Sequence, residues 1–412
     1  MTAITSGSAL HQQMIGWRHW LHQHPELCFE EFKTSDYIAE VLETLGVPFQ
    51  RGLATTGIVA TIKGQHEGGS IGLRADIDAL EITEANEFDH KSLHEGNMHG
   101  CGHDGHTTML LGAAAYLIQN NDFSGTVHLI FQPAEEGDAG AKKMIDEGLF
   151  EQFPCEEIYG MHNWPGLPAG QFAVHDTAVM AAVRTIKILI TGKGGHAAMP
   201  EQTVDPVLVG SHVITALQSI ISRNMSPVNS AVISITNVDA GFTHNVIPDV
   251  MNLTGTLRFF NREHGVMLIR RIRELVESIC HSFGATGELT VIGDYPATIN
   301  TPAEAQKSAD AAAKIVGVEN VQRTLPPSMA AEDFGYMLEE LPGAYIWIGN
   351  GEGEGGCMLH NAHYDFNDDV SALGASYWVQ LVQDRLSADA FSSDPAQADL
   401  AIFESPQAKA PE

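Results

Sequence analysis

Four short segments of this chain carry the side chains with which proteins bind metal ions and move protons. The first is MHGCGHDGHTT, in which a single glycine separates Cys101 from His103. Two residues at this spacing cannot share one face of a helix, but a glycine-rich loop lets both side chains converge on metal ions. The alternative is a small buried cysteine beside solvated histidines. The density of Cys, His and Asp favours the metal site.

The second segment, HLIFQPAEEG, ends an apolar run in two adjacent carboxylates, Glu135 and Glu136. Neighbouring residues that leave a strand point in different directions. One carboxylate can therefore bind a metal ion while the other faces a bound water molecule. Two surface glutamates in the first turn of a helix, where the helix dipole favours them, are the alternative.

The segments IYGMHNWPG and CMLHNAHYDFND add His162, His360 and His363. Each histidine is ambiguous alone, because a lone histidine after a strand is more often a core or capping residue. Together the four segments offer a thiolate, imidazoles and carboxylates, a mixture that suits zinc and leaves manganese, nickel and cobalt open. These donors outnumber the needs of one tetrahedral ion, so we expect two divalent metal ions per subunit.

Apolar runs that are typical of buried strands alternate with helical stretches around these segments. The expected strands are Gly57–Ile62, Ser70–Ala75, Thr126–Phe131 and Glu157–Met161, and the expected helices cover 11–46 with a break at His24-Pro25, then Thr107–Asn120 and Gly140–Glu147. This alternation predicts an α/β fold with a mostly parallel, helix-covered sheet. In such sheets ligands collect beyond the carboxyl ends of the strands, where the metal-type side chains lie.

The pattern changes at about residue 183. Strands are expected at Thr185–Thr191, Ala231–Asn237, Met251–Phe260 and Gly287–Ile292, and helices at Val204–Ser222 and Val266–Phe283. This βαββαβ order is the ferredoxin-like arrangement, one antiparallel sheet with helices on one face. The helix Ala303–Val316, the strand Ala344–Gly349 and the helix Ser371–Leu386 then resume the first pattern. We expect a catalytic domain formed by residues 1–182 and 296–387, an inserted domain at 183–295, and a disordered tail at 388–412.

The bulk composition narrows the classes of partner. The 412 residues carry a formal net charge of −30, which repels nucleic-acid phosphates and anionic lipid surfaces. The N-terminus lacks the basic and apolar regions of a signal peptide, and no apolar run is long enough to span a bilayer. The five scattered cysteines do not suggest a disulfide framework. We expect a cytoplasmic protein that acts on a small molecule, with neither nucleic acid nor membrane as a partner.

These motifs occur in an order that resembles the M20 metallopeptidase family. The matching segments are LRADIDAL at 73–80, MHGCGHDGHTT at 98–108, FQPAEEG at 131–137, MHNWP at 161–165, GKGGHAAMP at 192–200, HNVIPDV at 244–250, GTLR at 255–258, AAEDF at 330–334 and LHNAHYDFND at 359–368. Within the family the chain is most similar to hippurate hydrolases, N-acyl-amino-acid amidohydrolases and auxin-conjugate hydrolases. The resemblance covers roughly residues 15–385, and GCGHDGH together with PAEEG is its most specific part.

The resemblance implies a role for each residue of the metal site. It implies that Cys101 bridges two metal ions, that His103 and His162 complete one site, and that Glu136 and His360 complete the other. Glu135 would be the general base. Asp76 and Asp78 are expected to orient metal-binding imidazoles from behind, with turn carboxylates at a strand end as the alternative.

The inserted domain resembles the family's lid, through which these enzymes form homodimers or homotetramers. His196 matches a residue that stabilises the developing oxyanion, often in the partner subunit's site. Asn245 and Arg258 match positions that hold the substrate carboxylate, a task that suits the planar fork of arginine. An ion pair at a strand edge is the alternative for Arg258. The chain departs from the common pattern at Glu81, Gly100 and Ala362, positions that bear on loop rigidity and substrate preference.

We therefore expect an enzyme that hydrolyses the amide bond of an N-acyl amino acid such as hippurate and releases a carboxylic acid and a free amino acid. A dipeptidase or carboxypeptidase of the same family is the first alternative, and a free α-amine on its substrate would need an acidic partner in the pocket. A non-catalytic metal-binding relic is the second. Such a relic should have lost a ligand or the base, whereas every position is filled here.

Overall fold

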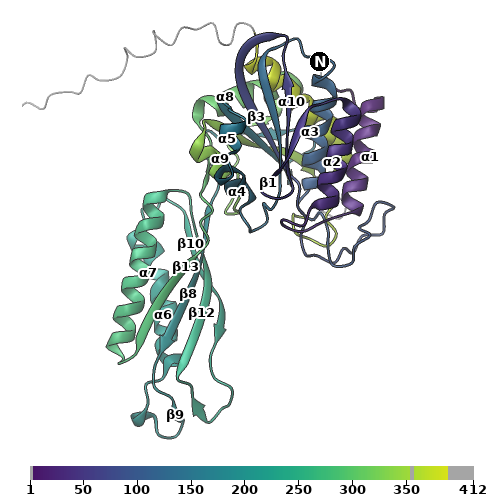
Figure 1. The fold of residues 1–412 in the computed structure, drawn as a ribbon. Helices are drawn as coiled ribbons and strands as arrows, with labels where there is room; N and C mark the ends of the chain where they lie inside the picture. The colour runs from purple at the N-terminus through teal and green to yellow at the C-terminus, as the bar shows by residue number, and fades with distance from the viewer. Residues whose placement is uncertain (1–2, 353–356, 388–412) are drawn as a thin grey trace, which may run out of the picture.

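The computed structural model describes residues 3–352 and 357–387, so the predicted disordered tail at 388–412 lies outside the described residues. The described chain forms an eight-stranded sheet and a four-stranded sheet that are joined by extended segments (Figure 1). The strands β7 (Ala178–Met180) and β14 (Thr298–Ile299) pair with each other where the chain passes between the two sheets. None of the helices in this part of the chain is long and apolar enough to cross a membrane.

The eight-stranded sheet confirms the predicted α/β class. Its strands lie in the order β1 (Phe49–Leu53), β2 (Gly57–Lys63), β4 (Ser124–Gln132), β3 (His66–Asp76), β5 (Glu157–Pro165), β16 (Gly343–Gly351), β6 (Phe172–Ala173) and β15 (Val321–Gln322). The central strands β4, β3, β5 and β16 are parallel to their neighbours within this group. Their carboxyl ends consequently meet at one edge of the sheet.

Side chains alternate between the two faces along each strand, and buried apolar residues occur on both faces. Helices therefore cover both faces of this sheet. On β2, Ile58 and Ala60 belong to one apolar core while Val59 belongs to the other. The first core is closed by α2 (Phe32–Leu45), α3 (His103–Leu117), α8 (Pro302–Val316) and α10 (Ser371–Arg385), with α1 (Ala9–Gln23) packed on α3. The second is closed by α4 (Gly140–Asp146), α5 (Leu149–Gln152) and α9 (Gly335–Glu340).

The four-stranded sheet follows the predicted βαββαβ order. Its elements are β8 (Ala182–Thr191), α6 (Pro206–Asn224), β10 (Ala231–Asp239), β12 (Val250–Phe259), α7 (Arg262–Ser282) and β13 (Thr286–Ile292). The strands lie in the order β10-β12-β8-β13, all antiparallel, and the two helices pack on one face over a separate apolar core. A small ribbon of β9 (Gly195–His196) and β11 (Val246–Ile247) lies at the end of this unit farthest from the eight-stranded sheet (Figure 1). Short 3-10 turns complete the described elements at Pro200–Gln202, Val318–Asn320 and Asp368–Val370.

The start of α3 differs from the sequence expectation. The helix begins at His103, four residues before the predicted Thr107. Gly102 precedes it in the left-handed conformation, with a φ of 89°, and a Cβ at this position would lie 2.2 Å from the side-chain nitrogen of Asn163. Only glycine suits such a turn, so Gly102 lets the chain enter the helix directly after Cys101. The two predicted ligands therefore lie in a loop and in the first helical turn, rather than in one loop.

Candidate metal centre

The carboxyl ends of the central strands bring the predicted metal-binding residues together. Glu136 follows β4, His162 lies near the end of β5, and His360 follows β16. Cys101 and His103 approach the same edge from the start of α3. This arrangement explains how residues from four distant segments can form one site.

The donor atoms form two clusters that share Cys101. In the first, donor atoms of Cys101, His103 and His162 all lie within 4.8 Å of one another, and in the second the same holds for Cys101, Glu136 and His360. The Cys101 Sγ lies 3.4 Å from Nε2 of His162, and Nε2 of His360 lies 3.2 Å from Oε1 of Glu136. His103 and His162 are buried, whereas the side chain of His360 is 52% exposed.

The hydrogen bonds of the two buried imidazoles fit a metal site. Nδ1 of His103 lies 2.9 Å from the carbonyl oxygen of Asp78 and 3.1 Å from its carboxylate, and Nδ1 of His162 lies 2.6 Å from the carbonyl oxygen of Asn163. Oxygen acceptors at these distances hold the proton on Nδ1, which leaves Nε2 with a free lone pair. Nε2 of His103 is buried and forms no hydrogen bond with any described residue, and the buried Oε1 of Glu136 faces the Nε2 atoms of His360 at 3.2 Å and of His103 at 4.0 Å. Unpaired buried donor atoms are costly, and a divalent cation would satisfy them.

The thiol of Cys101 needs a cation in order to ionise. Burial and the negative charges of Glu136 and Glu135 raise its pKa well above the ordinary range of a thiol. A thiolate at this position would therefore form only beside a bound positive charge, as in metal-thiolate sites. The donor set thus fits divalent metal ions of the zinc type.

The predicted supporting carboxylates have different partners. Asp78 holds His103, and its second oxygen accepts a hydrogen bond from the backbone N–H of Glu136 at 2.9 Å. Asp76 lies 2.6 Å from Nδ1 of His106 and 3.7 Å from Nε2 of His103. His106 in turn accepts a hydrogen bond at 2.9 Å from the backbone N–H that follows His162. Asp76 therefore braces the segment of His162 through a histidine to which the sequence assigned no role.

The two adjacent glutamates have different partners, although donor atoms of both lie within 4.8 Å of each other and of His103. Glu136 faces His360, whereas Oε1 of Glu135 accepts a hydrogen bond from the backbone N–H of Asp333 at 3.2 Å. The hydroxyl of Tyr295 donates to the main-chain oxygen of Glu135 at 2.8 Å. Burial and the charge of Glu332 raise the pKa of Glu135 well above its usual range. A buried carboxyl with a raised pKa can both accept and return a proton.

These residues open onto a cavity of about 420 Å³ between the two sheets. Besides the metal-type residues, its lining includes Trp164, Met180, Val183, Thr185, Arg258, Ile292, Tyr295, Glu332 and Leu359. Arg258 is half-buried and has no hydrogen-bond or ion-pair partner among the described residues. The alternative of an ion pair at a strand edge is therefore not observed. A cationic guanidinium and the metal-type cluster share one cavity.

His196 and Asn245 lie outside this cavity. His196 belongs to β9, and Asn245 immediately precedes β11, so both lie in the distal ribbon of the four-stranded unit (Figure 1). The backbone N–H of Ala197 donates to the carbonyl oxygen of Asn245 at 3.0 Å, and both predicted residues are exposed. The structure thus brings these two residues together, but not with the metal-type cluster of the same chain.

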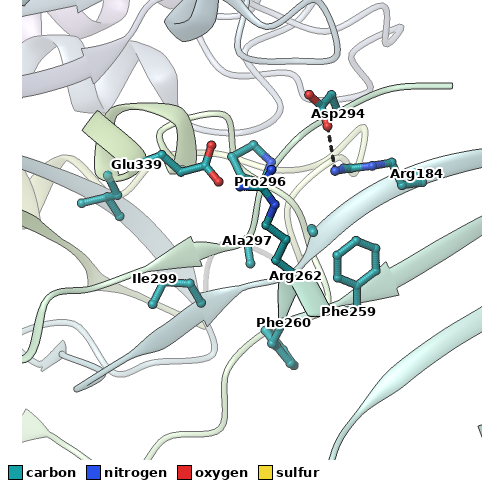
Figure 2. Close-up of a pocket in the computed structure, with 12 residues that line it drawn as sticks. Arg184, Phe259, Phe260, Arg262, Asp294, Pro296, Ala297, Ile299 and Glu339 are labelled. Atoms are coloured by element: carbon teal, nitrogen blue, oxygen red, sulfur yellow. Dashed lines mark hydrogen bonds and ion pairs between the residues drawn. The ribbon is translucent and has the colours of Figure 1, made fainter. Parts of the chain in front are cut away.

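The junction between the two sheets separates the cavity from a second one. Side chains of Val183, Thr185 and Tyr295 face the first cavity, whereas those of Arg184 and Asp294 line a cavity of about 210 Å³ on the other side. Arg184 donates to Asp294 at 2.8 Å, next to the ring of Phe259 (Figure 2). Its guanidinium also donates to the carbonyl oxygens of Val183 and Tyr295. Arg184 therefore links the strand that enters the four-stranded unit to the segment that leaves it, directly beside the site.

Sequence reasoning missed the residues that surround Glu135. Arg74, Glu332 and Asp333 form a buried ion-paired group next to it, and Glu332 lines the cavity. Two of the motifs quoted above, LRADIDAL and AAEDF, contain these residues, but neither suggested a role for them. Their signal is the presence of charged residues inside otherwise apolar strand and loop segments, which implies buried ion pairs.

Comparison with known proteins identifies the family to which this chain belongs. Residues 72–384 match the family described as peptidase family M20/M25/M40. The chain is 38% identical over 364 residues to hippurate hydrolase of Campylobacter jejuni, covering 88% of this chain and 94% of that protein. It is 38% identical over 380 residues to N-acetylcysteine deacetylase of Bacillus subtilis, covering 90% and 97%. A Bacillus subtilis structure described as a dinuclear metal-binding peptidase from the M20 family superposes with a TM-score of 0.80 at 33% identity, over 92% of this chain and 99% of that one.

Proposed function

Because this chain belongs to peptidase family M20/M25/M40 and is a metal-dependent amidohydrolase, we propose that it hydrolyses the amide bond of N-acyl amino acids. Hippurate represents the substrate class, and the products are a carboxylic acid and a free amino acid. The relatives named hippurate hydrolase and N-acetylcysteine deacetylase support this class of substrate.

The shared position of Cys101 in both clusters supports a pair of divalent ions, one with His103 and His162 and the other with Glu136 and His360. Zinc, manganese, nickel and cobalt all suit this donor set. When bound, such ions polarise an amide carbonyl and lower the pKa of water from about 15.7 to near 7.

Glu135 is the proposed general base. Its carboxylate takes a proton from the attacking water and delivers it to the nitrogen of the leaving amino acid, a role worth on the order of 10² to 10⁴ in rate. The hydrogen bond from the backbone N–H of Asp333 holds Oε1 of Glu135, and Glu135 lines the cavity. In this proposal Glu135→Gln retains metal and loses most turnover.

The position of Arg258 carries the proposal for the substrate. Its guanidinium lies in the same cavity as Glu135, without a partner among the described residues. A substrate carboxylate would satisfy it with two parallel hydrogen bonds. Every N-acyl amino acid presents that group at a fixed separation from the amide bond.

Kinetics on a matched pair of substrates test this role. We expect hippurate to be cleaved much faster than its C-terminal amide, and Arg258→Met to raise the KM for hippurate about tenfold or more. Arg262→Met is the control, because Arg262 is also unpaired in the described chain but lines the second cavity. Equal cleavage of hippurate and its amide by the parent enzyme would contradict the proposal.

The dipeptidase alternative is disfavoured by the charge balance of the cavity. Beyond the proposed base and metal ligand, the lining carboxylate is Glu332. It lies 3.0 Å from the guanidinium of Arg74 and accepts a hydrogen bond from the hydroxyl of Tyr345. No unneutralised carboxylate among the lining residues is left for a free α-ammonium group. Faster turnover of glycylglycine than of hippurate would instead favour a dipeptidase.

The exposure of the distal ribbon of β9 and β11 supports the proposal that a second copy of this chain is its partner. His196 would then stabilise the oxyanion in the partner's site, with Asn245 beside it, in a homodimer or homotetramer.

Cys28, Cys155 and Cys280 form no disulfide, which supports a reducing compartment such as the cytoplasm.

A further inference from the structure

A group of carboxylates surrounds the proposed base. Oxygen atoms of Glu135, Glu332 and Asp333 lie within 4.8 Å of one another, and all three residues are buried. Such a group resembles a cation site. The cation beside it is the side chain of Arg74, whose Nη2 lies 2.9 Å from Asp333 and 3.0 Å from Glu332.

Arg74 also reaches the histidine side of the site. Its Nη1 donates to Asp76 at 2.8 Å, and its Nε donates to the side-chain oxygen of Gln132 at 2.7 Å. Asp76 in turn holds His106, while the backbone N–H of Asp333 donates to Glu135. The guanidinium of Arg74 thus contacts Glu332 and Asp333 beside the proposed base and also Asp76, the carboxylate that holds His106.

No other described basic residue can take over this role. Among the described residues, Arg74 alone forms an ion pair with Glu332 or with Asp333. Its side chain is 1% exposed, so water does not screen the carboxylates that it separates. A lysine offers a point charge on a flexible stem and cannot bridge all these partners at once.

We propose that Arg74 is a positioning residue that sets the orientation of Glu135 through Asp333. The side chain of Asp333 is held between Arg74, the amide of Gln132 and the backbone N–H of Ala141, which lies 2.8 Å away. These contacts hold the backbone N–H of Asp333 within hydrogen-bond distance of Oε1 of Glu135. The inference rests on the proposed function of Glu135 as the general base.

The test is a kinetic cycle on metal-loaded enzyme with hippurate. Arg74→Lys is expected to lower kcat about 10- to 100-fold with KM within about twofold, because a misplaced base slows the chemical step without weakening binding. In a Glu135→Gln background the same change should alter kcat by less than about twofold, since no base remains to be misplaced. Metal content should stay at the parent value.

Arg18→Lys is the matched control. Arg18 is equally buried and is paired with Asp365 at 2.7 Å and Asp368 at 2.8 Å, but it does not line the cavity. Its change should leave kcat within about threefold. Asp333→Asn keeps the backbone N–H and removes the charge that Arg74 grips, so it provides a second variant with the same expected loss of kcat.

An equal loss of kcat for Arg74→Lys in the parent and in the Glu135→Gln background would overturn the inference, and so would loss of metal. If Arg74→Lys fails to fold, an unchanged kcat in Asp333→Asn overturns it as well. Full activity of Glu135→Gln alone would instead refute the proposed base, and the two failures are therefore distinguishable.

Discussion

The indole rings of Trp164 and Trp347 stack face to face, with their centroids 3.9 Å apart and their planes inclined by 4°. Trp347 is buried and contacts the ring of His175 edge-on at 4.6 Å. Trp164 lines the cavity, with its ring 6.3 Å from that of His162. The stack therefore holds a flat apolar wall beside the proposed metal site.

This wall predicts a preference for aromatic acyl groups. Trp164→Ala should lower kcat/KM for benzoylglycine about tenfold and that for acetylglycine about twofold, because only the benzoyl ring can stack on the indole. The ratio of the two kcat/KM values is the measurement. Trp17→Ala, which changes a tryptophan outside the cavity, serves as the control. Equal losses for both substrates would place the acyl group elsewhere.

The shared position of Cys101 predicts a coupled loss of both ions. Cys101→Ser should lower the bound metal from about two ions per subunit to fewer than one, since neither cluster keeps its full donor set. Elemental analysis after dialysis measures this. Cys280→Ser alters a cysteine in the core of the four-stranded unit and should retain both ions. A Cys101→Ser enzyme that still holds two ions at parent affinity would rule out the bridge.

The buried pair of His22 and Asp104 predicts a loss of stability at alkaline pH. Burial lowers the pKa of His22, but the hydrogen bond that its Nδ1–H donates to Asp104 at 2.8 Å and the negative charge of Asp104 outweigh burial and raise that pKa to about 9. A raised folded-state pKa stabilises the fold fully below about 6.5, and this contribution disappears as the pH rises through about 9. The expected fall in the free energy of unfolding is on the order of 1 to 3 kcal/mol.

Urea denaturation of the metal-loaded enzyme across this pH range measures that fall. His22→Gln should flatten the dependence, whereas His66→Gln, which removes an exposed histidine, should leave it unchanged. A slope that persists in His22→Gln would assign the effect to other groups.

The distal position of His196 predicts complementation between subunits. If His196 acts in the partner's site, His196→Ala and Glu135→Gln are each nearly inactive alone. Mixed and reassembled, they should recover about a quarter of the parent activity, because a random mixture forms half heterodimers with one intact site each. Mixing the His196→Ala/Glu135→Gln double variant with either single variant is the control and restores nothing. No recovery in the mixture of single variants would place His196 in its own subunit's site.

The sequence by itself determined the longer strands and helices and the set of candidate metal-binding side chains. Periodic apolar positions depend only on local spacing, so the alternation of strands and helices and the βαββαβ unit followed from it. The side-chain types of the predicted ligands, Cys101, His103, Glu136, His162 and His360, indicated divalent metal ions, because ligand preference is a property of the side chain.

Only the tertiary structure decided which of these side chains meet. It paired Asp76 with His106, a histidine that is not among the predicted ligands, and it placed Arg74 between Glu332 and Asp333, more than 250 positions away along the chain. It also put Arg258 in the cavity and left His196 at the far ribbon. Such contacts depend on how the strands cross over and on how the four-stranded unit is set at its junction. Local spacing contains no information about either, because both result from the packing of whole elements.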